Sequence, residues 1–252
     1  MSGARFVWYD LMTSDPKKAE GFYTKVLGWG TQPFEGMPYT MWTAGAVPIG
    51  GVGELQTQGA PPHWIAYISV PDVDEAVRKV ASLGGRTFVP ATDIPTVGRF
   101  AVLADPQGAV FAVFTPNDGG GGPVPDDANP KRGEFSWHEL ATSDYKKGFA
   151  FYQAMFGWEM LAEHDMGPLG IYALFGRDGK ELGGMFTIGP GMPMPPNWLQ
   201  YVLVESADAA ADRVKANGGK VLNGPMDVPG GDRIAQCMDP QGAAFAVHSK
   251  GA

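Results

Sequence analysis

Two long stretches of this sequence are each present twice, and the repetition limits the possible folds more than any other feature. A shift of 129 positions aligns residues 6–29 with 135–158, and 12 of the 24 aligned pairs are identical. A shift of 134 positions aligns 64–115 with 198–249, with 20 identities in 52 pairs. Repetition on this scale indicates a duplicated structural unit. The 252 residues are therefore predicted to form two related domains, 1–116 and 132–252.

The segment between the two copies, residues 117–131, is rich in glycine and proline and has no apolar periodicity. Such a composition forms neither a helix nor a strand with a buried face. It predicts an exposed linker, and the domain boundary is placed there.

Each copy contains one pattern twice. The first strand is predicted at 6–12, and a helix begins at Asp15 and Pro16 and ends at Gly28. Three strands then follow in the first half of the copy, at 29–34, 39–44 and 47–53. The second half repeats the order, with a strand at 63–70, a helix at 72–83, and strands at 86–89, 99–104 and 109–115. The prediction is an α+β fold made of four βαβββ units.

Composition excludes several classes of partner. The formal net charge is -8, with no run of Lys or Arg, which argues against binding to nucleic acid or to an anionic membrane. The start of the chain lacks a secretory pattern, and Cys237 is the only cysteine. Every apolar run is shorter than the roughly 18 to 20 residues that span a bilayer. We expect a cytoplasmic protein.

The repeated motifs resemble those of a known superfamily. Each copy contains Trp-x-Asp/Glu-Leu-x-Thr-Ser-Asp, then Phe-Tyr-x4-Gly-Trp, then Gly-Gly and Asp-Pro-Gln-Gly-Ala. Together these resemble the vicinal oxygen chelate superfamily, which includes glyoxalase I, bleomycin-resistance proteins and extradiol dioxygenases. The resemblance implies two glyoxalase-like domains whose curved mixed sheets enclose cups. In metal-dependent members, four His, Glu or Gln side chains in the cup bind a divalent ion.

The same resemblance locates the four ligand positions in each copy. They correspond to Trp8, Gly51, Ile65 and Ala112, and to Trp137, Gly184, Leu199 and Ala246. None of these side chains offers a lone pair suited to a divalent ion. We therefore expect no metal site and no cofactor. A divalent metal with displaced ligands, His63 with Glu54 or His164 with Glu181, is the alternative.

Strand alternation selects the polar groups of the cups. Asp10 lies two residues after Trp8, and Glu139 two residues after Trp137, so each acid is predicted to share the cup face. On the last strands the same face carries Phe114 in one copy and His248 in the other. Asp10, Glu139 and His248 are the candidate catalytic residues. The competing interpretation is that the acids are structural and that His248, close to the chain end, is solvated.

Aromatic residues supply candidate ligand contacts. The candidates are Trp8, Tyr39, Trp42, Trp137, Tyr172 and Phe114. Each can instead belong to the core. The Asp105-to-Gly108 and Asp239-to-Gly242 segments are interpreted as turns.

The function predicted is metal-independent binding of a small apolar or aromatic molecule, as in bleomycin-resistance members. The alternative is a lyase, hydroxylase or isomerase acting on a small carbonyl or antibiotic-like substrate. In that case Asp10, Glu139 or His248 transfers a proton, or displaced ligands bind a metal. The predicted partner is a small molecule, and either a monomer or a homodimer fits, because four βαβββ units suffice for two cups within one chain.

Overall fold

A computed structural model of the chain describes residues 4–55, 59–117, 126–192 and 194–251. It contains four consecutive βαβββ units, which confirms the predicted fold class. Residues 118–125, at the centre of the expected linker, lie outside the described residues.

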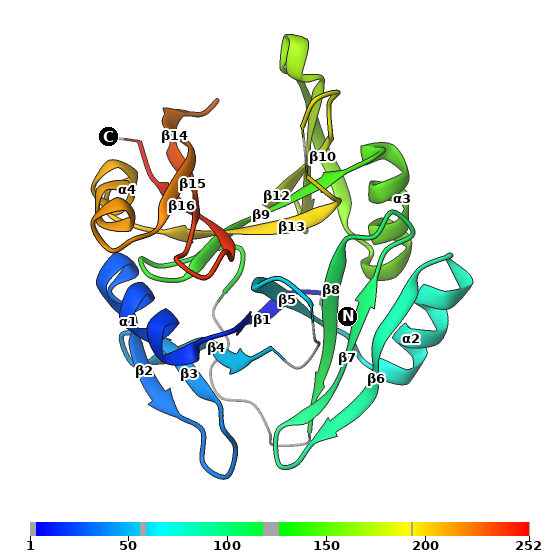
Figure 1. Cartoon of the computed structure of the whole chain (residues 1–252). Helices are drawn as coiled ribbons and strands as arrows, with labels where there is room; N and C mark the ends of the chain where they lie inside the picture. The colour runs from blue at the N-terminus through cyan, green and yellow to red at the C-terminus, as the bar shows by residue number, and fades with distance from the viewer. Residues whose placement is uncertain (1–3, 56–58, 118–125, 193, 252) are drawn as a thin grey trace. The chain divides into compact units, whose positions relative to one another are not determined.

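The first two units run from β1 to β8 (Figure 1). Their elements are β1 Phe6–Thr13, α1 Pro16–Leu27, β2 Gly30–Pro33, β3 Thr40–Ala44, β4 Val47–Glu54, β5 His63–Ser69, α2 Val73–Ser82, β6 Arg86–Ile94, β7 Gly98–Ala104 and β8 Val110–Pro116. The last two units are β9 Phe135–Thr142, α3 Tyr145–Phe156, β10 Glu159–Asp165, η1 Gly167–Leu169, β11 Ile171–Arg177, β12 Lys180–Thr187, β13 Asn197–Leu203, α4 Ala207–Ala216, β14 Lys220–Asp227, β15 Arg233–Met238 and β16 Ala244–Ser249.

The strands form two eight-stranded mixed sheets, one from each sequence half. Their orders are β2-β3-β4-β1-β5-β8-β7-β6 and β10-β11-β12-β9-β13-β16-β15-β14. Within each unit the helix allows the first strand to pair in parallel with the last, as β1 does with β4, while the remaining pairs are antiparallel hairpins. Neither sheet closes, so β2, β6, β10 and β14 are edge strands.

The helix boundaries follow the predicted capping residues. The Asp15 side chain accepts a hydrogen bond from the Lys18 N–H, and Gly28 ends α1 with φ 75°. Asp144 and Gly157 perform the same roles for α3. Among the described residues, no helix is long and apolar enough to cross a membrane.

The strand expected at 86–89 is longer than predicted, because β6 continues to Ile94. The predicted end falls just before Pro90, and proline has no N–H to donate to a neighbouring strand. The structure accommodates Pro90 with register shifts against β7 between Val89 and Thr92. Because β6 is an edge strand, the missing donor is tolerated.

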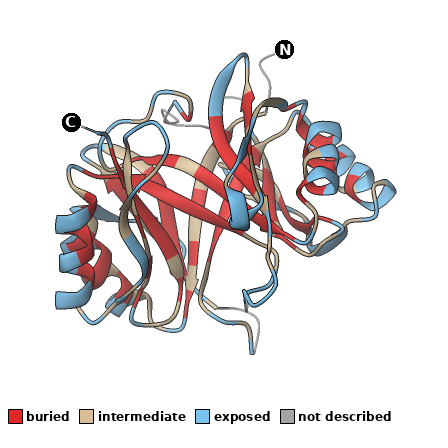
Figure 2. Cartoon of the chain, turned by 90° about the horizontal axis from the view of Figure 1, so that it is seen from above, coloured by how far each residue is buried: buried red, intermediate tan, exposed pale blue. Residues whose placement is uncertain are grey.

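The chain divides into two compact units, each combining parts of both copies. The first compact unit contains Met1–Val7, Ala66–Gly122 and His138–Trp198, and the second contains Trp8–Ile65, Pro123–Trp137 and Leu199–Ala252. Helix α2 packs with α3 in the first compact unit, and α1 packs with α4 in the second, as Figure 1 shows. The helices expose one face and bury the other, while the central strands are mostly buried (Figure 2).

Each compact unit has a core of aromatic rings. In the second, Tyr23 packs against Trp29 and Trp64 with ring centroids 5.8 and 5.4 Å away, and also against Trp42 at 5.6 Å. In the first, Tyr152 makes the corresponding contacts with Trp158 and Trp198. Aromatic side chains bury large areas, so these clusters contribute much of the hydrophobic stabilisation.

The turns that follow β7 and β15 are tied to these cores by a buried aspartate. In the second compact unit, Asp239 Oδ1 accepts hydrogen bonds from the N–H groups of residues 241, 242 and 243, and Oδ2 accepts from the Tyr23 hydroxyl. The Trp64 indole in turn donates to that hydroxyl. Asp105, Tyr152 and Trp198 repeat the arrangement in the first compact unit. Both aspartates are therefore structural.

These aspartates predict a specific pH dependence of stability. Burial raises the pKa of Asp239 above its ordinary value, and the hydrogen bonds that it accepts offset only part of that effect. As pH rises from about 4 towards the raised pKa, Asp239 loses its proton in the unfolded chain before it does so in the folded chain. The contribution of Asp239 to the free energy of unfolding therefore falls over this range. An asparagine cannot titrate. The stability advantage of the native chain over Asp239→Asn should therefore be larger at about pH 4 than at about pH 7 in urea unfolding. An advantage that stays constant or grows with pH would contradict the prediction.

Candidate functional site

Asp10, Tyr39 and Trp8 form a hydrogen-bonded group in the second compact unit. The Tyr39 hydroxyl donates to Asp10 Oδ1. The Trp8 indole N–H lies 3.0 Å from the same carboxylate oxygen and 2.8 Å from the Tyr39 hydroxyl. All three side chains are half-buried. The structure therefore brings together one predicted catalytic residue and two predicted ligand contacts.

The same acid–tyrosine pair recurs in the first compact unit. The Tyr172 hydroxyl donates to Glu139 Oε2 at 2.9 Å. Glu139 is 9% exposed, and the Tyr172 ring is half-buried and stacks with Phe186 at a centroid distance of 6.4 Å. Duplication has therefore kept the pair while exchanging aspartate for glutamate.

A glycine beneath each tyrosine makes the pair possible. A Cβ on Gly51 would lie 2.0 Å from the Tyr39 hydroxyl oxygen, and one on Gly184 would lie 2.2 Å from the Tyr172 ring. Any side chain at either position would push the ring away. These are the two positions where the family resemblance places a fourth-strand metal ligand. In this chain a tyrosine ring occupies that space instead.

The other inherited ligand positions are apolar. Ile65, Ala112, Leu199 and Ala246 are all buried hydrophobic residues. The remaining two positions hold Trp8 and Trp137, and an indole offers an N–H donor, which cannot ligate a cation. The residues present therefore do not fit the family's metal. Within the described ranges, no three or more His, Cys, Asp or Glu side chains are close enough to hold an ion.

The predicted displaced pair of His164 and Glu181 is not formed. His164 lies opposite Tyr172, which lies opposite Phe186, while Glu181 lies opposite Gly176. Glu181 is thus five residues away along β12, about 16 Å at the ordinary strand rise. The other predicted displaced pair is His63 with Glu54. In the structure, His63 Nδ1 lies 2.7 Å from the Pro61 carbonyl oxygen.

The three other predicted ligand contacts are Trp42, Phe114 and Trp137. Trp42 is fully buried in the aromatic core with Tyr23, so its position is that of a core residue. Phe114 is half-buried on β8, opposite Phe100 on β7. Trp137 is half-buried and packs against a cluster on β13 and β16 formed by Leu199, Tyr201 and Ala246.

His248 is buried, so its interpretation as a solvated terminal residue is wrong. Its residue exposure is 7%, and it lies within β16. Nδ1 is 3.0 Å from Ser136 Oγ, and Nε2 is 2.7 Å from Asp232 Oδ2. Asp232 also accepts hydrogen bonds from Lys250 Nζ and the Gly251 N–H. These contacts hold the imidazole between a hydroxyl and a carboxylate.

Burial and hydrogen bonding shift the pKa values of both His248 and Asp232. Burial lowers the pKa of His248 below the ordinary imidazole value, although the Asp232 hydrogen bond and charge oppose it. For Asp232, burial raises the pKa, but the hydrogen bonds from His248, Gly251 and Lys250 together outweigh it, so the net shift is downward. The pair is consequently a neutral imidazole beside a carboxylate at neutral pH.

Cys237 and His138 are buried residues that belong to the packed core. Burial raises the pKa of the Cys237 thiol to about 12, which keeps the thiol protonated. His138 is fully buried, stacks on Phe6 at 3.5 Å, and has Nδ1 2.9 Å from the Leu182 carbonyl oxygen. Both residues are part of the packed core.

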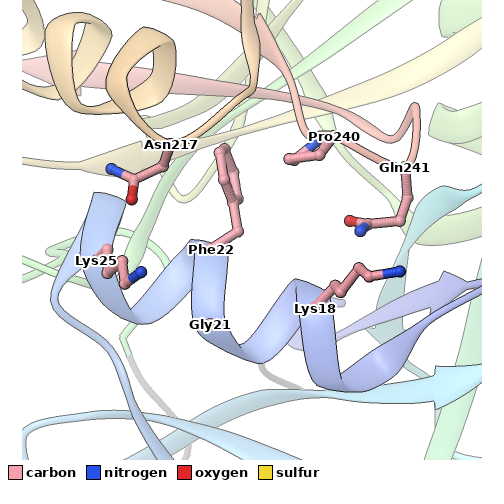
Figure 3. A pocket seen from close by; sticks show the side chains of 7 residues that line it. All are labelled: Lys18, Gly21, Phe22, Lys25, Asn217, Pro240 and Gln241. Carbon is pink, nitrogen blue, oxygen red and sulfur yellow. The ribbon is translucent and has the colours of Figure 1, made fainter.

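A surface pocket lies between α1 and the ends of α4 and β15 (Figure 3). It is lined by Lys18, Gly21, Phe22, Lys25, Asn217, Pro240 and Gln241. Its volume is about 290 Å³. Lys18 is paired with Asp15 at 2.8 Å, and none of the predicted site residues lines this pocket. Its position follows from the packing of α1 with α4.

Paired βαβββ units in two open mixed sheets define this chain as a two-domain glyoxalase-like protein. Two protein-family sequence models match the chain. The family described as "Glyoxalase-like domain" matches residues 7–114, and the family described as "Glyoxalase/Bleomycin resistance protein/Dioxygenase superfamily" matches residues 134–247. The chain belongs to this superfamily, as the motif resemblance predicted.

Relatives extend over nearly the full chain. It is 35% identical over 248 residues to "Putative glyoxylase CFP32" of Mycobacterium tuberculosis (strain CDC 1551 / Oshkosh), covering 95% of this chain and 92% of that protein. It is 30% identical over 259 residues to "Anthracycline biosynthesis protein DauV" of Streptomyces sp. (strain C5), covering 95% and 91%. A solved structure, the Mn(II)-bound glyoxalase from Novosphingobium aromaticivorans, matches with a TM-score of 0.65 at 14% identity, over 99% of this chain and 82% of that one. This last likeness shows the fold alone.

Proposed function

We propose that this chain binds a small apolar or aromatic molecule at its two acid–tyrosine pairs, without the metal ion of the superfamily's enzymes. One observation carries the proposal: the same pair occurs in both copies, each above a glycine at an inherited ligand position. A half-buried aromatic ring offers apolar surface, and a carboxylate held beside it offers a polar anchor. That combination is typical of small-molecule sites.

The relatives narrow the choice of ligand. Two of them are named as anthracycline biosynthesis proteins, which makes a polycyclic aromatic ketone a reasonable ligand class for this chain. The flat ring system would lie against the tyrosine and tryptophan rings, and its hydroxyl groups would donate to Asp10 or Glu139. Daunorubicin is a suitable probe, because its fluorescence reports binding.

The test is a fluorescence titration of the purified chain with daunorubicin. The native chain should bind the drug, and the double variant Tyr39→Phe/Tyr172→Phe should bind at least about tenfold more weakly, the equivalent of roughly 1.4 kcal/mol. The matched control is Tyr145→Phe, because Tyr145 also donates to a glutamate, Glu163 at 2.8 Å, but belongs to neither pair. Glu163 lies opposite Ala173, whose side chain is on the other face of the strand from Tyr172. The affinity of Tyr145→Phe should equal that of the native chain.

Chelation tests the metal-independent part of the proposal. Affinity for daunorubicin should be unchanged after treatment with EDTA. Binding lost on chelation and restored by Mn²⁺ would contradict this, as would a stoichiometric divalent ion in protein purified without an affinity tag.

A second candidate function is catalysis on the same ligand class, favoured by relatives named for biosynthesis and for glyoxylase activity. In that case Asp10 or Glu139 would accept a proton from a carbon next to a carbonyl. Measuring substrate turnover distinguishes the two candidate functions, binding and catalysis. A binding protein returns daunorubicin unaltered in mass and absorbance, whereas an enzyme converts a carbonyl substrate at a rate that Asp10→Asn/Glu139→Gln abolishes.

A further inference from the structure

Three residues of the second copy form a polar group that the first copy lacks. The aligned pairs are Ser136 with Val7, Asp232 with Gly98, and His248 with Phe114. In the first copy, a Cβ on Gly98 would lie 2.6 Å from the Phe114 ring, so the ring fills that space. In the second copy the two aligned residues, Asp232 and His248, are in hydrogen-bond contact.

The surrounding framework is the same in both copies. The residue after Gly98 is Arg99, which pairs with two aspartates, and the residue after Asp232 is Arg233, which does the same. The ion pairs are Arg99 with Asp74 and Asp93, and Arg233 with Asp208 and Asp227. Since these residues align with one another, the two copies share a framework here and differ in the three side chains that it carries.

The hydrogen-bond roles of the three groups follow from their chemistry. The Asp232 carboxylate can only accept, so His248 Nε2 carries the proton and donates to it. In a neutral imidazole Nδ1 then has a lone pair, and Ser136 Oγ–H is its donor at 3.0 Å. The other acceptor within reach of that hydroxyl, the Tyr201 carbonyl oxygen, lies farther away at 3.3 Å. The order is hydroxyl, imidazole, carboxylate.

From this geometry we propose that Ser136 is a nucleophile, activated by His248 and oriented through Asp232, that cleaves small aryl esters with an apolar acyl group. A serine, a base and a group that orients the base are recognised as such a triad by geometry, not by position in the sequence. The inference goes beyond the binding function proposed above and does not depend on it.

The reaction needs no reactant other than the ester and water. Ser136 Oγ attacks the acyl carbon while its proton passes to His248 Nδ1. The bond from that carbon to the aryl oxygen then breaks, and the aryl oxide takes the proton from Nδ1. Water next attacks the acyl-serine, gives its proton to Nδ1, and releases the carboxylic acid as Ser136 regains its hydrogen.

Apolar neighbours set the class of ester. His248 lies opposite Leu203 on β13 and Ile234 on β15. Trp137 and Ile234 both pack against the apolar cluster of Leu199, Tyr201 and Ala246. An apolar acyl or aryl group is therefore the better match to these surroundings than a charged one.

The test is labelling with a fluorophosphonate, which forms a stable bond to an activated serine with loss of fluoride. Intact mass should show one adduct per chain, and peptide mapping should place it on Ser136. Ser136→Ala should remove the adduct together with p-nitrophenyl butyrate hydrolysis. Asp232→Asn, which keeps the shape of the side chain, should slow labelling at least about tenfold, because the imidazole loses the carboxylate that orients it.

Ser143→Ala is the matched control, since the Ser143 hydroxyl donates to the Gln107 side chain instead of to an imidazole. It should label and hydrolyse as the native chain does, and circular dichroism should show all variants folded. An unlabelled Ser136 in the native chain, or labelling that Asp232→Asn leaves unchanged, would overturn the proposal. Daunorubicin binding is measured separately, so failure of either proposal leaves the other standing.

Discussion

Asp239→Ala should lower the free energy of unfolding by about 3 to 5 kcal/mol, the largest loss of stability that we expect from one polar substitution. The carboxylate accepts three backbone N–H groups and the Tyr23 hydroxyl, and it is 3% exposed. Alanine would leave the Ala243 N–H and the Tyr23 hydroxyl buried without this acceptor and the Gln241 N–H partly buried without it, while the Gly242 N–H keeps its bond to the Asp239 carbonyl oxygen. Each buried unsatisfied group costs about 1 to 3 kcal/mol before relaxation. Urea unfolding followed by circular dichroism measures the loss.

The duplication supplies controls for this experiment. Asp105→Ala removes the equivalent group of the first compact unit and should cost a similar amount. Asp239→Asn keeps an acceptor oxygen and should cost less. Asp212→Ala, on the exposed side of α4 and paired with Lys215, should change stability by at most about 0.5 kcal/mol. Equal losses for Asp239→Ala and Asp212→Ala would show that the turn does not depend on its aspartate.

Gly51→Ala and Gly184→Ala should abolish the acid–tyrosine pairs while leaving the fold intact. The new methyl group would lie 2.0 Å from the Tyr39 hydroxyl oxygen in one variant and 2.2 Å from the Tyr172 ring in the other. The atoms that must move are the outer ends of side chains, so the ring can swing away without disturbing the strand. We expect the double variant to bind daunorubicin at least about tenfold more weakly, as measured by fluorescence titration.

Gly53→Ala is the matched control, because residues two apart on β4 share a face. A Cβ at Gly53 would lie 3.7 Å from the nearest atoms of Met12, an ordinary contact, so this variant should bind as the native chain does. Unchanged affinity in Gly51→Ala/Gly184→Ala would show that the tyrosine positions do not matter for binding.

The sequence alone was sufficient for features that arise from local or repeated patterns. The two shifts of 129 and 134 predicted the duplication, and Asp15 and Gly28 predicted where α1 begins and ends. A capping residue acts on backbone groups within a few positions, so its effect is legible in a short window. The end of β6 was missed, because whether Pro90 can stay in a strand depends on its being at a sheet edge.

The sites depended on tertiary structure. Asp10 and Glu139 were selected by strand alternation, but their partners Tyr39 and Tyr172 are 29 and 33 residues away, and their pairing depends on Gly51 and Gly184. Likewise, Ser136 and His248 are 112 residues apart, so no local signal joins them. What the sequence determined was the repeated unit. Which polar groups meet was decided only by the sheets, because pairing register brings distant residues within hydrogen-bond distance.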